Sequence, residues 1–132
     1  TLEAFTKSCI KLAREKEYAE TMMGRRRKLP GVNSNNGMVK AFAERNAVNA
    51  PIQGSAADII KVAMVKLFNE LEKGDWKAKI IMQVHDELVL DVPKDELELL
   101  KPIVRECMES AVEIIVPLIV DMKSGEDWLA AH

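Results

Sequence analysis

The sequence has few cysteines and no long hydrophobic run, and both absences narrow the class of protein. No stretch of eighteen apolar residues occurs, so the sequence predicts no membrane-spanning segment. No basic start followed by an apolar run and a small-residue cleavage site marks a secretory signal. Two cysteines, Cys9 and Cys107, are too few for a disulfide-stapled secreted domain, so we expect free thiols and a reducing, cytoplasmic compartment.

Several short motifs that often identify an enzyme are also missing. The sequence contains no Gly-rich phosphate loop, no CxxC pair and no Gly-x-Ser-x-Gly elbow, and it shows no internal repeat. What remains is an ordinary composition, with 132 residues of which 48% are apolar and 30% charged. These values are typical of one soluble globular domain or of a part of a larger one. Because the first residue is Thr1 and not Met, we expect that the chain was excised from a longer polypeptide.

Charge is distributed unevenly along the chain. Residues 1–66 contain 12 Lys and Arg against 6 Asp and Glu, whereas residues 67–132 contain 7 against 15. A basic half indicates either an anionic partner such as nucleic acid or an ordinary solvated face. Charge alone favours the solvated face.

Hydrophobic periodicity predicts alternating helices and hairpins. Helical spacing occurs in residues 2–16, 38–49, 53–73 and 95–115. Short apolar or alternating runs predict strands at 18–23, 25–29, 79–84, 87–92 and 118–122, before a closing helical turn at 127–131. Pro51 predicts a break or kink between the two central helices. Because hairpins rather than helical crossovers join the strands, the pattern predicts an α+β fold with helices on one face of an antiparallel β-sheet.

The hairpin at residues 79–92 places polar residues at its tip. The loop is His85-Asp86, and Glu87 follows it. Neighbouring strand residues face opposite ways, so the three side chains cannot all bind one ion, but the carboxylate of Asp86 suits Mg²⁺. A plain polar turn is the alternative, and the triplet alone favours it.

Three polar residues, Arg45, Asn49 and Gln53, recur at a spacing of four. They share one helical face if the kink at Pro51 does not rotate Gln53 away. Their donors can reach the N3 and O2 acceptors of the DNA minor groove, which all base pairs present, and such contacts test pairing geometry. Surface residues that cap a kinked helix are the alternative, which the spacing alone favours.

Four consecutive cations, Arg25 to Lys28, lie in the first predicted hairpin. Their mutual repulsion requires either solvation or phosphate partners. Because strand side chains alternate between faces, only half of them can meet one partner, which favours a solvated hairpin.

Several segments nevertheless resemble family A DNA polymerases. Glu44–Lys61, with the sequence ERNAVNAPIQGSAADIIK, resembles the conserved segment after the fingers, and Gln83–Leu90, QVHDELVL, resembles that family's motif C. Glu20-Thr21 with Gly24–Arg27 is similar, as is the ending Gly125–Trp128 with Ala131-His132. The resemblance covers essentially the whole chain. It is to the C-terminal, palm-derived part of the bacterial enzymes.

The resemblance implies roles for the hairpin residues. Asp86 matches the palm aspartate that binds the catalytic metal ions, His85 matches a residue near the primer terminus, and Glu87 matches a supporting acidic neighbour. The chain is thereby expected to be part of a DNA-directed DNA polymerase that extends a primer by Mg²⁺-dependent nucleotidyl transfer in replication and repair.

The resemblance also implies DNA contacts. Arg45, Asn49 and Gln53 match positions that contact template and primer near the nascent base pair, and His85 and Arg25 join them as expected DNA-binding residues. Primer-template DNA and deoxynucleoside triphosphates are the implied partners. The implied division is a helix and basic hairpin in 1–37, a kinked helix pair in 38–74, and a palm hairpin with a C-terminal helix and strand in 75–132.

One departure from the family pattern affects the chemistry. The second metal-binding aspartate of the family belongs to motif A, which resembles Asp-Tyr-Ser-Gln-Ile-Glu, and neither motif A nor the fingers helix occurs here. Because the reaction uses two ions about 3.5–4 Å apart, we expect an incomplete Mg²⁺ site and an inactive isolated chain. The missing strand also predicts an open hairpin edge and self-association.

Two other classes of protein remain as alternatives. One is a non-catalytic DNA-binding module derived from a polymerase. The other is a small metal hydrolase built on His85 and Asp86, which would leave the match of residues 45–61 unexplained.

Overall fold

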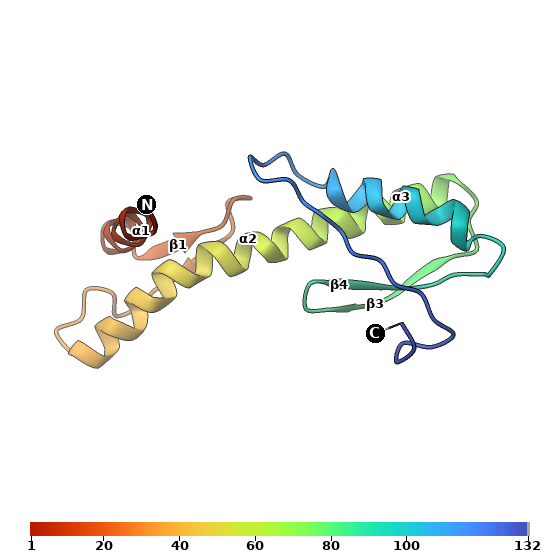
Figure 1. Cartoon of the computed structure of the whole chain (residues 1–132). Coiled ribbons are helices and arrows are strands. Elements are labelled where there is room, and N and C mark those ends of the chain that lie inside the picture. Colours follow the sequence, from red (N-terminus) through yellow and green to blue (C-terminus); the bar gives the residue numbers. More distant parts are fainter. Residues whose placement is uncertain (132) are drawn as a thin grey trace. The chain divides into compact units, whose positions relative to one another are not determined.

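The computed structural model describes residues 1–131, and it has the α+β composition that the sequence predicts. Its elements are α1 (Leu2–Lys16), β1 (Tyr18–Glu20), β2 (Arg26–Lys28), α2 (Gly37–Lys73), β3 (Lys79–Val84), β4 (Glu87–Asp91) and α3 (Leu97–Glu109) (Figure 1). The described strands form two separate antiparallel pairs, β1–β2 and β3–β4, rather than one larger sheet. His132, the last residue of the family-like ending, lies outside the described residues.

The chain divides into two compact units, Thr1–Asp58 and Ile59–His132, and the division falls inside α2. The first unit has a core of small and medium side chains: Ala13, Ala19, Leu29, Val32, Ala43, Ala47 and Ala50. Ala13 comes from α1 and Ala19 from β1, Leu29 and Val32 follow β2, and the other three residues lie on α2. Because five of the seven are alanines, the backbones of these elements can approach closely. Helix α2 is capped in the loop before it, where Asn36 Oδ1 accepts from the backbone N–H of Met38 at 3.0 Å.

Helix α2 runs without interruption through Pro51, so the predicted pair of helices is wrong. Proline removes one N–H from a helix and costs about 3 kcal/mol in a helix interior. The helix persists because its face is buried on both sides of the proline, by Ala47 and Ala50 before it and by Ile60 and Ala63 after it. Packing in the core therefore outweighs the local preference.

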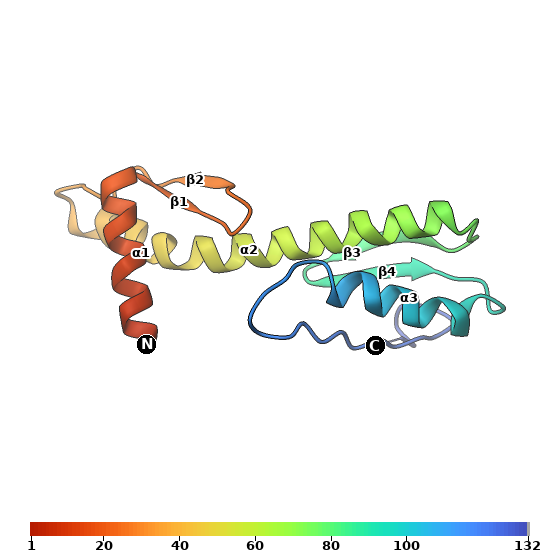
Figure 2. The ribbon, with the colours of Figure 1, turned by 90° about the horizontal axis from the view of Figure 1, so that it is seen from above.

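The second unit packs one face of the β3–β4 hairpin against two helices. Its core contains Leu67 and Leu71 from α2, Ala78, and Leu100, Val104 and Cys107 from α3. The hairpin side chains that pack on this core are Ile80, Leu88 and Leu90. Figure 2 shows α3 and the end of α2 beside the hairpin. The expected arrangement of helices on one face of antiparallel strands is confirmed for this unit.

The chain after α3 differs from the sequence prediction. Helix α3 ends at Glu109, well before residue 115, and residues 118–122 form no strand. A strand needs a neighbour for its backbone groups, and the backbone N–H of Val120 instead donates to Glu109 Oε1 at 3.0 Å. The closing turn predicted at residues 127–131 is present, held by a 3.1 Å bond from Ala131 N–H to Asp127 O.

Two further findings concern thiols and membranes. Cys9 and Cys107 are free thiols, as predicted, and burial raises the pKa of each. Among the described helices, none combines the length and the apolar character needed to cross a bilayer.

Candidate functional site

The polar residues of α2 keep their spacing because the helix is continuous. Arg45, Asn49 and Gln53 lie within about 80° of one another around the helix, since successive residues turn by about 100°. All three are exposed, and the Arg45 guanidinium lies 6.0 Å from the centre of the Phe42 ring. Within residues 1–131, the amides of Asn49 and Gln53 make no side-chain hydrogen bond, so their donors are available to a partner.

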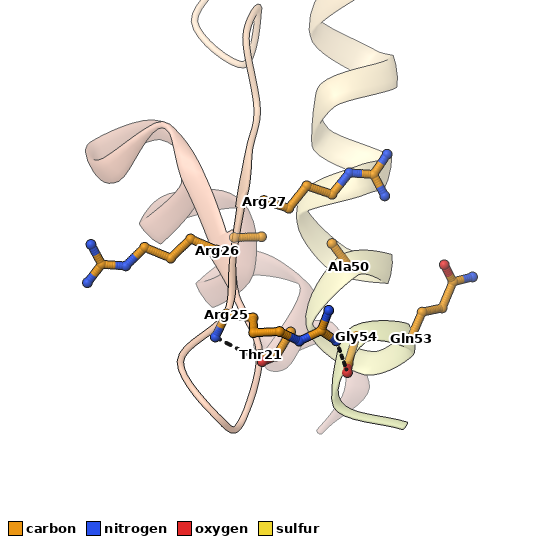
Figure 3. Close-up of a pocket in the computed structure, with 8 residues that line it drawn as sticks. Thr21, Arg25, Arg26, Arg27, Ala50, Gln53 and Gly54 are labelled. Carbon is orange, nitrogen blue, oxygen red and sulfur yellow. Dashed lines mark hydrogen bonds between the residues drawn. The ribbon is translucent and has the colours of Figure 1, made fainter. Parts of the chain in front are cut away.

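The basic turn between β1 and β2 presents its arginines in two directions. Figure 3 shows Arg25 and Arg27 extending toward α2, whereas Arg26 points away from it. Arg26 is neutralised locally, because its Nε donates to Glu20 Oε2 at 2.8 Å and its guanidinium lies 4.6 Å from the centre of the Tyr18 ring. The alternation that the sequence predicts is present, and it separates Arg26 from its two neighbours.

A buried carboxylate holds Arg25. Asp58 on α2 is only 4% exposed, and it accepts a 2.5 Å hydrogen bond from the Thr21 hydroxyl and a 2.5 Å charged hydrogen bond from Arg25 Nε. The hydrogen bond from Thr21, followed by the bond and the charge of Arg25, holds the pKa of Asp58 below its ordinary value despite burial. Asp58 is therefore an ionised acceptor that ties the turn to the helix.

Additional contacts bring the same turn close to α2. Arg25 Nη2 donates to the carbonyl of Gly54 at 2.9 Å, and the backbone N–H of Met22 donates to Ser55 Oγ at 2.9 Å. Gly54 makes this approach possible, because a Cβ at that position would lie 2.4 Å from Thr21 Cγ2. A glycine in a helix interior costs about 1 kcal/mol relative to alanine, so its presence here indicates a packing requirement.

An open cavity of about 150 Å³ lies between the turn and the helix. Gln53 and Arg27 line it, together with Ala19, Thr21, Arg25, Arg26, Ala50 and Gly54. Of the three arginines, Arg25 and Arg26 pair with carboxylates, while Arg27 has no ion pair within the described residues. Arg27 is thus the arginine of this cavity whose charge is available to a ligand. The guanidinium of Arg25 is already partly occupied by its bonds to Asp58 and Gly54.

The other predicted site residues lie at the tip of the β3–β4 hairpin, in the second unit. Val84 pairs with Glu87 across the two-residue loop His85-Asp86, as the spacing predicts. His85 has a φ of 51°, and its carbonyl accepts a 2.9 Å hydrogen bond from Gln83 Nε2. His85, Asp86 and Glu87 are all exposed on this support.

The donor set at the tip fits part of a Mg²⁺ site. The Asp86 carboxylate is exposed and supplies the hard oxygen that Mg²⁺ prefers. In the part of the chain that the structure describes, no three His, Cys, Asp or Glu side chains come together as a possible metal site. These residues can therefore supply one ligand but cannot by themselves hold a pair of ions.

Asp58, Thr21 and Gly54 are site residues that the sequence interpretation missed. A signal was present, because Asp58 continues the stripe of Ala43, Ala47 and Ala50 that faces the first core. A carboxylate on a buried helical stripe requires a partner, and basic residues occur in the preceding hairpin. The sequence could not show which arginine that partner would be.

Comparison with known proteins assigns the family. The profile described as "DNA polymerase family A" matches residues 1–130, so the chain belongs to the family A DNA polymerases and the family that the resemblance indicated is confirmed. It is 48% identical to DNA polymerase I of Lactococcus lactis subsp. lactis (strain IL1403) over 130 residues, which are 98% of this chain and 15% of that protein. It is 45% identical to DNA polymerase I of Bacillus subtilis (strain 168) over 130 residues, again 98% of this chain and 15% of that protein.

A solved structure matches as well. The chain superimposes with a TM-score of 0.93 and 44% identity on the structure titled "POL domain of Pol1 from M. smegmatis complex with DNA primer-template and dNTP". This match covers 96% of the present chain and 22% of that one. The chain thus has the fold of part of a polymerase domain, and it spans about 15% of the length of the curated relatives.

Proposed function

We propose that the chain is the C-terminal, palm-derived part of a cytoplasmic DNA-directed DNA polymerase that extends primers in replication and repair. The observation that carries this proposal is the exposed carboxylate of Asp86 at the tip of a hairpin, within a segment that resembles motif C. The similarity to proteins named DNA polymerase I supports it. So does a structural neighbour whose title names primer-template DNA and dNTP.

At the hairpin tip, we assign Asp86 as a ligand of Mg²⁺. When bound, a pair of such ions supplies charge for activating the 3′-hydroxyl and stabilising the leaving pyrophosphate. The β3–β4 ladder and the bond from Gln83 to the His85 carbonyl hold the loop in one conformation. His85 is assigned to the primer terminus, and Glu87 is assigned as the supporting acidic neighbour.

On α2, Arg45, Asn49 and Gln53 form a proposed duplex surface. Their exposed donors lie on one helical face and suit the acceptors that all base pairs share in the minor groove. Such contacts respond to the geometry of a pair rather than to its identity. Arg27 is assigned to a DNA phosphate, and Arg25 contributes through the part of its guanidinium that Asp58 and Gly54 leave free.

The proposed duplex surface is tested by Gln53→Ala in the full-length polymerase. We expect slower extension, with a change in the ratio of rates from matched and mismatched primer ends. Asn69→Ala is the matched control, because Asn69 is also an exposed residue on α2 but lies outside the polar face. If Gln53→Ala leaves both the rate and the ratio unchanged, the minor-groove assignment is wrong.

We further propose that the isolated 132 residues do not catalyse nucleotide addition. The described residues contain no cluster of three potential metal ligands, and the sequence contains no motif A. Primer extension with Mg²⁺ or Mn²⁺ and all four nucleotides is the test, and we expect no product above a control without protein. Extension that disappears in Asp86→Ala would contradict this proposal while supporting the role of Asp86.

The division into parts is proposed on the same basis. Residues 1–37 provide a helix and the basic hairpin, residues 38–74 the long helix with the duplex surface, and residues 75–132 the hairpin that carries motif C. The helix pair of the sequence prediction becomes one helix in this division.

A further inference from the structure

The Thr21–Arg25 turn is bonded to a single stretch of α2, residues 54–58. Arg25 bonds the Gly54 carbonyl, Met22 bonds Ser55, and Thr21 and Arg25 both bond Asp58. This stretch begins directly after Gln53, a member of the proposed duplex surface. The turn is therefore fixed to the part of the helix that continues from that surface.

Thr21 links the two sides of this arrangement. Its hydroxyl donates to Asp58 Oδ2 at 2.5 Å and accepts from the backbone N–H of Arg25 at 3.2 Å. The turn is also closed internally, since the backbone N–H of Thr21 donates to the Arg25 carbonyl at 2.9 Å. Loss of the Asp58 carboxylate would remove the partner of both the Thr21 hydroxyl and Arg25 Nε, and only the bonds to Gly54 and Ser55 would still hold the turn on α2.

The charges give this arrangement a consequence for ligand binding. Asp58 neutralises Arg25, and Glu20 neutralises Arg26. Arg27, in strand β2 just after the turn, has no ion pair among the described residues and lines the same cavity as Gln53. Arg27 and Gln53 line the same cavity but belong to different elements. Their relative position therefore depends on what holds the turn to the helix.

We propose that Asp58 is a positioning residue that holds the Thr21–Arg25 turn on α2 and thereby fixes Gln53 and Arg27 relative to each other for one DNA duplex. The inference rests on the proposed function and assigns a role to a buried residue outside the proposed duplex surface. Because pairing geometry is sensed by Gln53, substitution of Asp58 should alter the mismatch ratio only while the Gln53 amide is present.

The test uses single-turnover extension by the full-length polymerase on matched and mismatched primer ends. Asp58→Asn keeps the shape but weakens the acceptor, and Thr21→Val removes the hydroxyl at nearly constant shape without leaving a buried charge unpaired. We expect both variants to slow matched extension by about tenfold or more. A mutation distant from the chemistry that misplaces a positioning group by about 1 Å can reduce the rate by about a hundredfold. Thr21→Ser keeps the hydroxyl and should restore the rate.

A double-mutant cycle separates positioning from general stability. If Asp58 acts through Gln53, adding Asp58→Asn to Gln53→Ala should change the mismatch ratio no further than Gln53→Ala alone. Asp95→Asn, at an exposed aspartate of the second unit, is the matched control. Measurements well below the unfolding midpoint of each variant remove effects of lower stability.

The outcomes discriminate between the two proposals. Additive effects of Asp58→Asn and Gln53→Ala, or no effect of Asp58→Asn and Thr21→Val, would refute the positioning role while the duplex surface stands. No effect of Gln53→Ala would refute the duplex surface itself. A mismatch ratio that responds to Asp58→Asn only when Gln53 is present would support both.

Discussion

Gly54→Ala tests how closely the Thr21–Arg25 turn lies against α2, because two physical effects oppose each other there. In an open helix interior, replacing glycine by alanine stabilises a protein by about 1 kcal/mol. At Gly54 the added Cβ would lie 2.4 Å from Thr21 Cγ2, whereas carbon atoms pack best at about 3.5–4.0 Å. The turn or the helix would have to move by about an ångström.

The magnitude follows from what that movement disturbs. Thr21 cannot rotate its methyl group away freely, because its hydroxyl is bonded to Asp58. Overpacking costs about 1–3 kcal/mol and a lost hydrogen bond about 1 kcal/mol, which together exceed the gain in helix propensity of about 1 kcal/mol. We expect the free energy of unfolding to fall by about 1–3 kcal/mol.

Urea and thermal unfolding of the 132-residue chain, followed by circular dichroism, provide the assay. Gly37→Ala is the control for the general effect of alanine, since no atom lies within 4 Å of a Cβ at that position. Serine lacks the methyl group that clashes. Gly54→Ala should therefore lower the free energy of unfolding much less in a chain that carries Thr21→Ser than in the original chain. An increase in stability for Gly54→Ala, or no recovery in the double variant, would refute the close approach of turn and helix.

Three further predictions concern acid, salt and assembly. Because hydrogen bonds lower the pKa of Asp58, its contribution to stability is complete above its ordinary pKa of 3.8 and is lost as the pH falls through the lower folded-state value. Urea unfolding curves measured across the acid range should therefore lose this pH dependence in Asp58→Asn. The same acid behaviour in the variant and the original chain would contradict the prediction. Arg27→Ala should reduce the salt slope of primer-template binding by about 0.9, whereas Arg26→Ala, at an arginine already paired with Glu20, should leave it unchanged. The edges of the β3–β4 hairpin have no further strand among the described residues, so sedimentation over a dilution series should detect association of the 132-residue chain, and a strict monomer at high concentration would contradict this.

Elements with strong local signals could be predicted from the sequence, and those that depend on distant partners could not. Helix α1 and the β3–β4 hairpin match their periodicity and loop spacing closely. Pro51 was a misleading signal, because its local cost is offset by burial of the alanines that precede it, in a core that also contains Ala13 and Leu29. Residues 118–122 have the apolar character of a strand, but a strand requires a partner that the sequence pattern does not specify.

The candidate site divides in the same way. The resemblance predicts roles for Asp86 and for the face of Gln53 from contiguous segments. It also counted Arg25 as a DNA contact, without indicating that Asp58, 33 residues further along, binds its guanidinium. That pairing depends on the approach of the turn to α2, and only the structure shows the approach. The sequence therefore shows where the arginines occur, but not which of them pair within the chain and which remain exposed.

The central claim, that Asp86 belongs to the catalytic metal site of a polymerase, is tested most directly by Asp86→Ala in the full-length enzyme. Single-turnover extension and equilibrium binding of primer-template DNA should be measured on the same preparation, with Asp95→Ala as the control for loss of an exposed carboxylate. We expect extension to fall to near the background rate while the DNA dissociation constant changes little. A fall in DNA affinity that matches the fall in rate, or extension that persists without the Asp86 carboxylate, would contradict the claim.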